Sequence, residues 1–189
     1  MNIGLYFGSF NPIHTGHCII ANHVINHTVL EQVWFVLSPQ NPFKQSASLL
    51  NEYHRLHLVK VAIETESNLK ASDIEFNMPR PSFTIDTLTY ITEKYPQHLF
   101  AVIMGSDGFQ NISKWKNYNI ILANYHLYVY TRAGFEIEAN DSKSLTVLDA
   151  PLLQISSTRI REYIRQHKSI RYLVPDKVME EITNNGYFK

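Results

Sequence analysis

Short, nearly continuous apolar runs recur along this chain and predict the strands of a sheet. Residues 33–37 and 99–104 are uninterrupted apolar runs, a pattern typical of strands that are buried on both faces of a parallel sheet. Residues 3–7 and 127–130 also have strand character, and residues 69–76 form a weaker candidate. Together these runs predict a sheet.

Segments with helical spacing separate the predicted strands. Residues 15–30, 51–66 and 84–95 are predicted helices, and the segment around 110–123 also has helical character. Strands and helices that alternate in this way predict an α/β protein with right-handed crossovers. We therefore expect residues 1–189 to form a single domain with a Rossmann-like, doubly wound parallel sheet and helices on both faces.

Four loops follow predicted strands, and this position gives them a common location. They span residues 8–17, 38–44, 105–107 and 131–134. Ligands of open α/β sheets bind beyond the carboxyl ends of the strands, so we expect these loops to converge on one site. Residues 135–144 are polar and charged, and are expected to form a mobile surface loop.

The first candidate site is the sequence G-S-F-N-P-I-H-T-G-H at residues 8–17, directly after the first strand. It reads as a tight turn that leads into a helix, whose first N–H groups and positive dipole end favour a phosphate. His14 and His17 are three residues apart, which predicts that both imidazoles lie on one helical face. Gly8 and Gly16 permit close approach of the backbone to a ligand. This segment predicts a nucleotide-phosphate site.

The second candidate site is the sequence I-S-S-T-R-I-R at residues 155–161. Ser156, Ser157 and Thr158 are predicted to form the N-terminal turn of a helix, with Arg161 one turn further along. Hydroxyls, free N–H groups and a guanidinium again suit an anion. Two such segments in one chain could hold both ends of a triphosphate.

Simpler interpretations exist for each of these residues. His14 and His17 could be zinc ligands or ordinary histidines at a helix start, although no Cys/His partner motif occurs elsewhere. Residues 156–158 could be a plain helix cap. Asp107 could cap the next helix, and Trp115 could belong to the core.

Composition narrows the possible partners. The 189 residues contain 17 Lys plus Arg and 17 Asp plus Glu, so the formal net charge is zero. A nucleic-acid or anionic-membrane surface usually has a basic excess, so neither partner is expected. The single cysteine, Cys18, cannot form an internal disulfide, and no signal peptide or membrane-spanning run is evident. We expect a cytoplasmic protein.

The two candidate sites together resemble the nucleotidyltransferase superfamily with the H-x-G-H signature. More narrowly, the chain resembles the bacterial nicotinate-mononucleotide adenylyltransferases. The resemblance runs from residue 2 almost to the C-terminus. Its supporting segments are P-Q-N-P-F-K at 39–44, S-F-T-I-D-T-L at 82–88, G-S-D at 105–107, Trp115, T-R at 131–132, R-Y-L-V-P at 171–175 and G-Y-F at 186–188.

This resemblance implies a reaction. The 5′-phosphate of nicotinate mononucleotide attacks the α-phosphate of ATP, which gives nicotinate adenine dinucleotide and pyrophosphate in NAD biosynthesis. Mg²⁺ is implied as a companion of ATP, held mainly by phosphate oxygens and water, so no metal-ligating residues are expected. ATP and nicotinate mononucleotide are the implied partners. The sequence leaves the oligomeric state open, a homo-oligomer included.

The resemblance also implies roles for individual residues. His14, His17, Lys44 and Arg161 are the implied catalytic residues, with His17 at the α-phosphoryl group. The other residues fall into an ATP-binding set and a substrate-binding set. The implied ATP-binding set is Gly8, Ser9, Phe10, His14, His17, Gly105, Asp107, Ile155, Ser156, Ser157, Thr158 and Arg161, and the substrate-binding set is Lys44, Thr84, Trp115 and Arg132.

Two positions depart from the family pattern. Phe7 stands where many members have a glycine, and Phe43 stands where a histidine is often found before Lys44. The first difference concerns the shape of the turn and the second concerns one contact to a substrate phosphate. The alternatives are a phosphopantetheine adenylyltransferase and a non-catalytic nucleotide-binding domain of the same fold. The segments 39–44 and 82–88 argue against the former, and His17 and Arg161 argue against the latter.

Overall fold

Strands and helices alternate along the chain in the computed structural model, which describes residues 1–40, 49–135, 137, 144–151 and 154–189. The strands are β1 (Asn2–Gly8), β2 (Gln32–Leu37), β3 (Leu69–Ser72), β4 (Leu99–Gly105), β5 (His126–Tyr130) and β6 (Leu145–Leu148). The α-helices are α1 (Thr15–His27), α2 (Glu52–Ala62), α3 (Thr84–Lys94), α4 (Ser106–Phe109), α5 (Tyr118–Asn124), α6 (Ser157–Arg165) and α7 (Asp176–Asn185). Two short 3-10 helices are η1 (Ile74–Asn77) and η2 (Ile112–Lys114).

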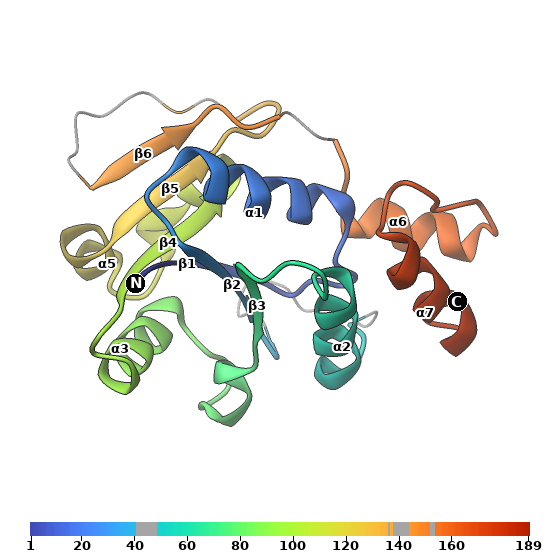
Figure 1. Ribbon diagram of the computed structural model, residues 1–189, viewed down its shortest axis with the longest axis horizontal. Coiled ribbons are helices and arrows are strands. Elements are labelled where there is room, and N and C mark those ends of the chain that lie inside the picture. Colours follow the sequence, from blue (N-terminus) through green and yellow to red (C-terminus); the bar gives the residue numbers. More distant parts are fainter. Residues whose placement is uncertain (41–48, 136, 138–143, 152–153) are drawn as a thin grey trace.

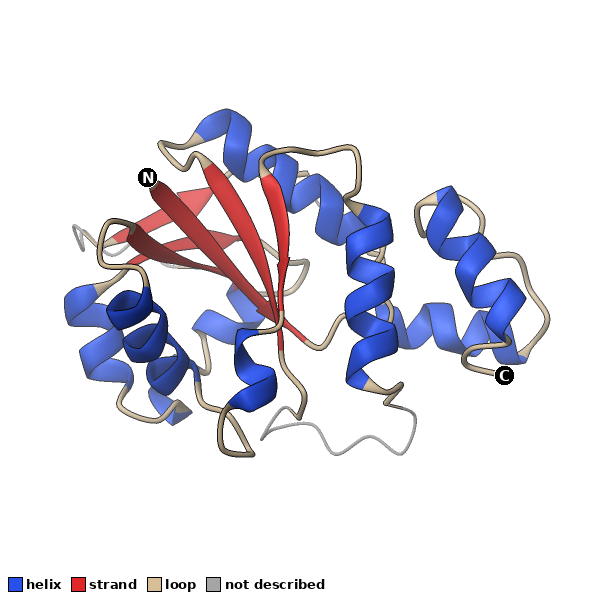
Figure 2. Cartoon of the chain, turned by 60° about the horizontal axis from the view of Figure 1, so that its bottom comes forward, coloured by secondary structure: helices blue, strands red, loops and turns tan. Residues whose placement is uncertain are grey.

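The strands form one six-stranded sheet in the order β3-β2-β1-β4-β5-β6, and every neighbouring pair is parallel. The chain starts at the central β1, moves outwards to β3, and then crosses to β4 and moves outwards to β6. Figure 2 shows the strands fanning out between helices. This order is the doubly wound arrangement that the sequence predicts, and it places all carboxyl ends at one edge.

Helices cover both faces of the sheet, and each face has its own core. Alternate side chains of β1 enter opposite cores, because Ile3 and Leu5 face one side and Tyr6 faces the other. The Tyr6 side packs against α1, α2, α6 and α7, whereas the Ile3 side packs against α3 and α5. Figure 1 shows α1 and α3 on opposite sides of the strands. The apolar runs are therefore strands buried on both faces, as expected.

Several boundaries differ from the sequence prediction. The strand predicted at 69–76 ends at Ser72 and is followed by η1, and the helix predicted around 110–123 is divided into η2 and α5. The backbone of Asn117, the N-cap residue of α5, has a φ of 50°, a left-handed conformation that interrupts the helical backbone between η2 and α5. The strand β6 lies next to the segment predicted as a mobile loop, most of which lies outside the described residues.

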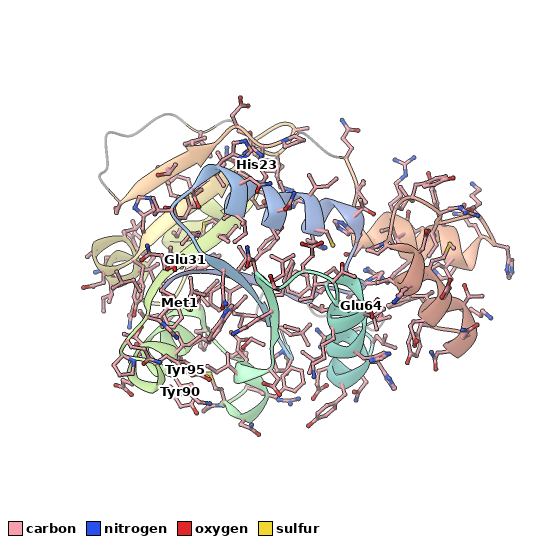
Figure 3. All side chains as sticks on the ribbon, in the orientation of Figure 1. Met1, His23, Glu31, Glu64, Tyr90 and Tyr95 are labelled. Carbon is pink, nitrogen blue, oxygen red and sulfur yellow. The ribbon has the colours of Figure 1, made fainter. Side chains whose placement is uncertain are left out.

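The C-terminal segment closes one end of the molecule, where α6 and α7 lie beside α2 (Figure 1). Lys177 of α7 pairs with Glu64, just beyond α2, and His57 of α2 lies 3.3 Å from Glu181 of α7. Figure 3 labels Glu64 at this end, far from Met1 at the start of β1. The backbone N–H of Thr15, the first residue of α1, donates to the carbonyl of Leu173 at 2.9 Å. The chain before α7 thus contacts the start of α1.

Candidate active site

A cavity of about 340 Å³ lies at the carboxyl edge of the sheet. It is bounded by the turn after β1, by the ends of β4 and β5, and by the first turn of α6. It brings together most of the residues that the sequence singles out. The predicted residues that line it are Gly8, Ser9, Phe10, His14, His17, Gly105, Asp107, Trp115, Arg132, Ser156, Ser157, Thr158 and Arg161.

Residues 8–17, which we call the phosphate turn, begin with a close approach of backbone and ring. A Cβ on Gly8 would lie 2.8 Å from Cζ of Phe10, so only glycine fits there. Phe10 has a φ of 45° and is buried, with its ring centroid 5.1 Å from that of His17 and 5.3 Å from that of Phe35. Phe10 therefore supports the turn from the core, besides lining the cavity.

His14 and His17 form a stacked pair at the start of α1. Their ring centroids are 3.6 Å apart at an interplanar angle of 19°, and Nδ1 of His17 accepts from the backbone N–H of His14 at 3.3 Å. His14 is the N-cap residue with an extended backbone, so the pair arises from stacking across the cap and not from two positions inside the helix. Both rings nevertheless reach the same cavity, as the spacing predicts.

Burial holds His14 in its neutral form. Only 4% of its surface is exposed, and desolvation together with the positive charge of Arg132 lowers its pKa to about 4. Its Nδ1 is buried and has no hydrogen-bond partner among the described residues. Such orphaned atoms are uncommon in folded proteins and indicate a missing ligand, ion or water.

The first turn of α6 is joined directly to the phosphate turn. Ser157 Oγ donates to the carbonyl of Pro12 at 2.8 Å, and Nη1 of Arg161 donates to the carbonyl of Asn11 at 2.6 Å. Ser156 caps the helix, because its Oγ accepts from the N–H of Arg159 at 3.3 Å. The two candidate anion sites are thus two walls of one cavity.

Arg161 is a partly buried cation that forms no ion pair among the described residues. No ion pair involves it within the described part of the chain, and its Nε is buried with no hydrogen-bond partner there. Burial and the nearby Arg165 lower its pKa from the ordinary value, which is the expected effect of desolvating a cation. A partly buried cation that forms no ion pair favours the binding of an anion from solution.

The ends of β4 and β5 supply an ion pair. Asp107 Oδ2 accepts from Arg132 Nη1 at 2.7 Å, and the N–H of Arg132 donates to Ser106 Oγ at 2.9 Å. A Cβ on Gly105 would lie 2.5 Å from Oδ1 of Asp107 and 2.9 Å from Cδ of Arg132. Glycine at this position therefore lets the pair form directly above the strand end.

Sequence reasoning missed a pair of tyrosines in the cavity wall. The hydroxyls of Tyr6 and Tyr130 are 3.0 Å apart, and burial raises the pKa of both. Both side chains line the cavity beside Arg132. The sequence feature that could have revealed them is a tyrosine near the carboxyl end of each apolar strand, just before a loop that is predicted to contribute to the site.

Three predicted residues are not among these lining residues: two lie elsewhere in the fold and one lies outside the described residues. Ile155 lines a smaller adjoining cavity of about 30 Å³, together with His14, Gly16 and Pro151. Thr84 is the first residue of α3. Two residues further along this helix, Asp86 forms an ion pair at 2.8 Å with Lys116, which follows Trp115 in the sequence. The third, Lys44, lies outside the described residues, as does Phe43.

The charged and polar groups of the cavity favour the binding of anions. Among the residues that the structure describes, no group of three or more His, Cys, Asp or Glu side chains could hold a metal ion. The cavity's carboxylate, Asp107, is already paired with Arg132. Within the described ranges, no helix has the length and apolar character needed to cross a membrane.

Comparison with known proteins gives consistent relatives. A family model described as cytidylyltransferase-like matches residues 5–163. A probable nicotinate-nucleotide adenylyltransferase of Cytophaga hutchinsonii is 50% identical over 189 residues, 100% of this chain and 98% of that protein. One of the same name from Flavobacterium johnsoniae is 47% identical and covers 100% of both chains.

Solved structures show the same fold. The nicotinic acid mononucleotide adenylyltransferase of Plasmodium falciparum, complexed with NaAD, superposes with a TM-score of 0.84 over 99% of this chain and 97% of that one. A second structure of the enzyme, complexed with APC, gives a TM-score of 0.83 over 99% of this chain and 96% of that one. Both are 21% identical to this chain, so the likeness concerns the fold.

Proposed function

Because the chain belongs to the cytidylyltransferase-like family and, within it, to the nicotinate-nucleotide adenylyltransferases, we propose a mechanism for its cavity. In this mechanism the cavity binds ATP and nicotinate mononucleotide and transfers the adenylyl group of ATP to the mononucleotide. The product is nicotinate adenine dinucleotide, an intermediate of NAD biosynthesis. The observation that carries the proposal is the joining of two anion-binding segments, the phosphate turn and the first turn of α6, in the walls of one cavity.

The reaction is a direct displacement at phosphorus. An oxygen of the mononucleotide 5′-phosphate forms a bond to the α-phosphorus of ATP, while the bond from that phosphorus to the bridging oxygen breaks and pyrophosphate leaves. The attacking group is already anionic, so neither a general base nor a covalent nucleophile is needed. The protein contributes positioning and stabilisation of the charge that moves onto the leaving group.

The histidine pair and the first turn of α6 bind the ATP phosphates in this proposal. His17 contacts the α-phosphoryl group in the transition state, and the neutral His14 donates or accepts one hydrogen bond at its orphaned nitrogen. Ser157, Thr158 and Arg161 hold the β- and γ-phosphates, because Arg161 is a cation that forms no ion pair among the described residues and its Nε has no hydrogen-bond partner there. The phosphate turn contributes its backbone N–H groups.

The remaining cavity residues bind the nucleosides. Gly105 and Asp107 face the ribose of adenosine, and Arg132 fixes the carboxylate of Asp107 through their ion pair. Trp115 offers a stacking surface to the pyridine ring, with Thr84 at the start of α3 as its companion. Lys44 holds phosphate charge on the acceptor side, a role that rests on the sequence alone.

The metal belongs to the substrate. Mg²⁺ prefers oxygen ligands and keeps several waters, so it enters as the ATP complex, held by phosphate oxygens. The cations and N–H donors of the cavity fit the phosphates of this complex. The oligomeric state and the cytoplasmic location stay predictions of the sequence.

A pyrophosphate-release assay tests the proposed reaction. Purified protein is given ATP and Mg²⁺ with nicotinate mononucleotide, nicotinamide mononucleotide or phosphopantetheine in parallel. We expect turnover with nicotinate mononucleotide, and the ratio of the two pyridine acceptors measures the preference for the carboxylate. Pyrophosphate release with phosphopantetheine alone would show that phosphopantetheine, and not a pyridine mononucleotide, is the acceptor substrate. No release with any of the three acceptors would favour a non-catalytic nucleotide-binding domain.

The variant His17→Ala tests the catalytic assignment in the same assay. Removing one preorganised donor to a transition-state anion typically lowers kcat by roughly 10²- to 10³-fold. We expect a loss of this size with a melting temperature close to that of the wild type. The matched control is His27→Ala at the other end of α1, outside the cavity. Equal kcat values for the two variants would remove His17 from the mechanism.

A further inference from the structure

Arg55 of α2 is a fully buried arginine that lies behind the phosphate turn. None of its surface is exposed, and it is the largest side chain in the described chain that is buried this completely. Its guanidinium donates four hydrogen bonds, all to backbone carbonyls. They reach Ser9 at 2.6 Å, Leu50 at 2.7 Å, Ser38 at 2.9 Å and Pro39 at 3.0 Å.

These carbonyls come from three separate segments. Ser9 belongs to the phosphate turn, Ser38 and Pro39 follow β2, and Leu50 precedes α2. The guanidinium is planar with its donors in a fixed fork, so it holds the three segments in one relative geometry. A lysine in its place could direct donors from only one point.

A contribution to stability alone does not explain an arginine at position 55. Within the described residues no carboxylate forms an ion pair with it, and burial lowers its pKa to about 10, which leaves it charged at neutral pH. A buried, unpaired charge opposes folding, and apolar side chains of similar size often serve stability as well or better. Retention of a cation here points to a role in the cavity beside it.

The contact with Ser9 connects Arg55 to the cavity. Ser9 lines the cavity, and its carbonyl would repel a phosphate if it turned towards one. The hydrogen bond from Arg55 holds this oxygen towards the guanidinium and therefore away from a bound phosphate. Two further bonds hold the same layer together, because Ser38 N–H donates to the Gly8 carbonyl at 3.0 Å and Leu50 N–H donates to Asn11 Oδ1 at 3.1 Å.

We propose that Arg55 is a positioning residue for adenylyl transfer, which fixes the phosphate turn against the end of β2 and the approach to α2 without touching either substrate. This inference rests on the proposed function. It assigns Arg55 a specific effect, because loosening the turn misplaces the groups that bind the ATP phosphates. A misplacement of about 1 Å at such a site can cost about 10²-fold in rate.

The test compares Arg55→Lys with the wild type and with Arg171→Lys, the same change at an exposed position outside the cavity. We expect Arg55→Lys to remain folded, because the positive charge is kept. We expect its kcat/KM for ATP to fall roughly 10- to 100-fold, together with weaker binding of a non-hydrolysable ATP analogue with Mg²⁺ in calorimetry. Arg171→Lys should match the wild type in both measurements.

A second variant separates positioning from stability. Arg55→Ala leaves a space that matches a guanidinium, and millimolar methylguanidinium is expected to restore part of the lost kcat/KM, whereas methylammonium is not. Arg55→Lys with wild-type kinetics, or with a lost fold, would overturn the proposal, and so would equal rescue by both cations. Inactivity of the wild type itself would instead contradict the proposed function.

Discussion

At the scale of single residues, the cavity is defined by groups whose ionisation is set by burial. His14 is kept neutral by desolvation and by the charge of Arg132, and the hydroxyls of Tyr6 and Tyr130 are held protonated by burial. Arg161 stays cationic without a carboxylate partner among the described residues. The positive charge of the cavity wall therefore comes from arginine and from backbone N–H groups, and not from the imidazole of His14.

The depressed pKa of His14 makes stability depend on pH. The unfolded chain takes up a proton at this side chain near the ordinary pKa of 6.5, whereas the folded chain resists it down to about 4. The free energy of unfolding contributed by neutral His14 is thus present above pH 6.5 and is lost as the pH falls towards 4. Linkage gives a loss of about 2 kcal/mol between pH 7 and pH 5.

Urea denaturation at the two pH values measures this loss. The variant His14→Gln has no titratable group at this position, so its loss over the same interval should be smaller by the amount that His14 contributes. The remaining ionisable groups are the same in both proteins, so their contributions cancel in the comparison. Identical losses in wild type and variant would show that His14 titrates normally in the folded protein.

At the scale of elements, the success of sequence reasoning followed the depth of burial. The strands around 33–37 and 99–104 were predicted because both of their faces are buried, which makes them continuous apolar runs. The strand β6 was missed because it is a short edge strand with the exposed residue Val147, which leaves little apolar signal.

The site loops were located because parallel topology alone brings the strand ends together. The ion pair of Asp107 with Arg132 was not predictable, because neither segment has a sequence feature that indicates a partner 25 positions away. Nor was the role of Arg55 predictable, because it sits in a helix with no motif, and its partners are backbone carbonyls of other segments. Hydrogen bonds to backbone carbonyls of distant segments do not depend on the residue types of those segments, so they cannot be read from the sequence.

The junction of β4 and α4 gives a prediction at this scale. In Gly105→Ala the new methyl group would contact Asp107 and Arg132 at less than van der Waals distance, so their ion pair must move. We expect a loss of about 1–3 kcal/mol in the free energy of unfolding and a higher KM for ATP. Gly108→Ala, in the same helix α4, is the control for stability, because its methyl group would meet nothing within 4 Å.

Thermal denaturation of the two alanine variants distinguishes packing from propensity. Gly108→Ala should leave the melting temperature unchanged or raise it, since alanine favours a helix more than glycine does. A Gly105→Ala protein as stable as Gly108→Ala would show that the ion pair relaxes without cost.

At the scale of the whole molecule, the C-terminal segment stabilises the fold beyond the residues that the family model matches. That match ends at residue 163, yet α7 contributes Val178 and Ile182 to the core that it shares with α1 and α2. The contact of Leu173 with the first N–H of α1 brings this segment to the start of the helix that follows the phosphate turn. The tail is therefore part of the structural support of the cavity.

Truncation of a single side chain in α7 tests this support. Ile182 is 2% exposed, so Ile182→Ala should lower the free energy of unfolding by about 2–5 kcal/mol. The substitution is outside the cavity, so kcat should be unchanged at temperatures where the variant is folded. Ile120→Ala is the matched control, because Ile120 is 45% exposed and its loss should cost under about 1 kcal/mol. Urea denaturation of both variants provides the measurement, and similar losses would refute a supporting role for α7.

The bond between Arg161 and the carbonyl of Asn11 spans 150 positions, and that between Thr15 and the carbonyl of Tyr172 spans 157. A ribosome therefore delivers the phosphate turn early and its partners late. Because β1 lies in the middle of the sheet, it also waits for β4 before both of its edges are paired. During synthesis, which adds about 5–20 residues per second, roughly 7 to 30 seconds pass between the synthesis of the turn and that of α6. A nascent chain thus acquires its nucleotide site only after α6 and the segment before α7 have been translated.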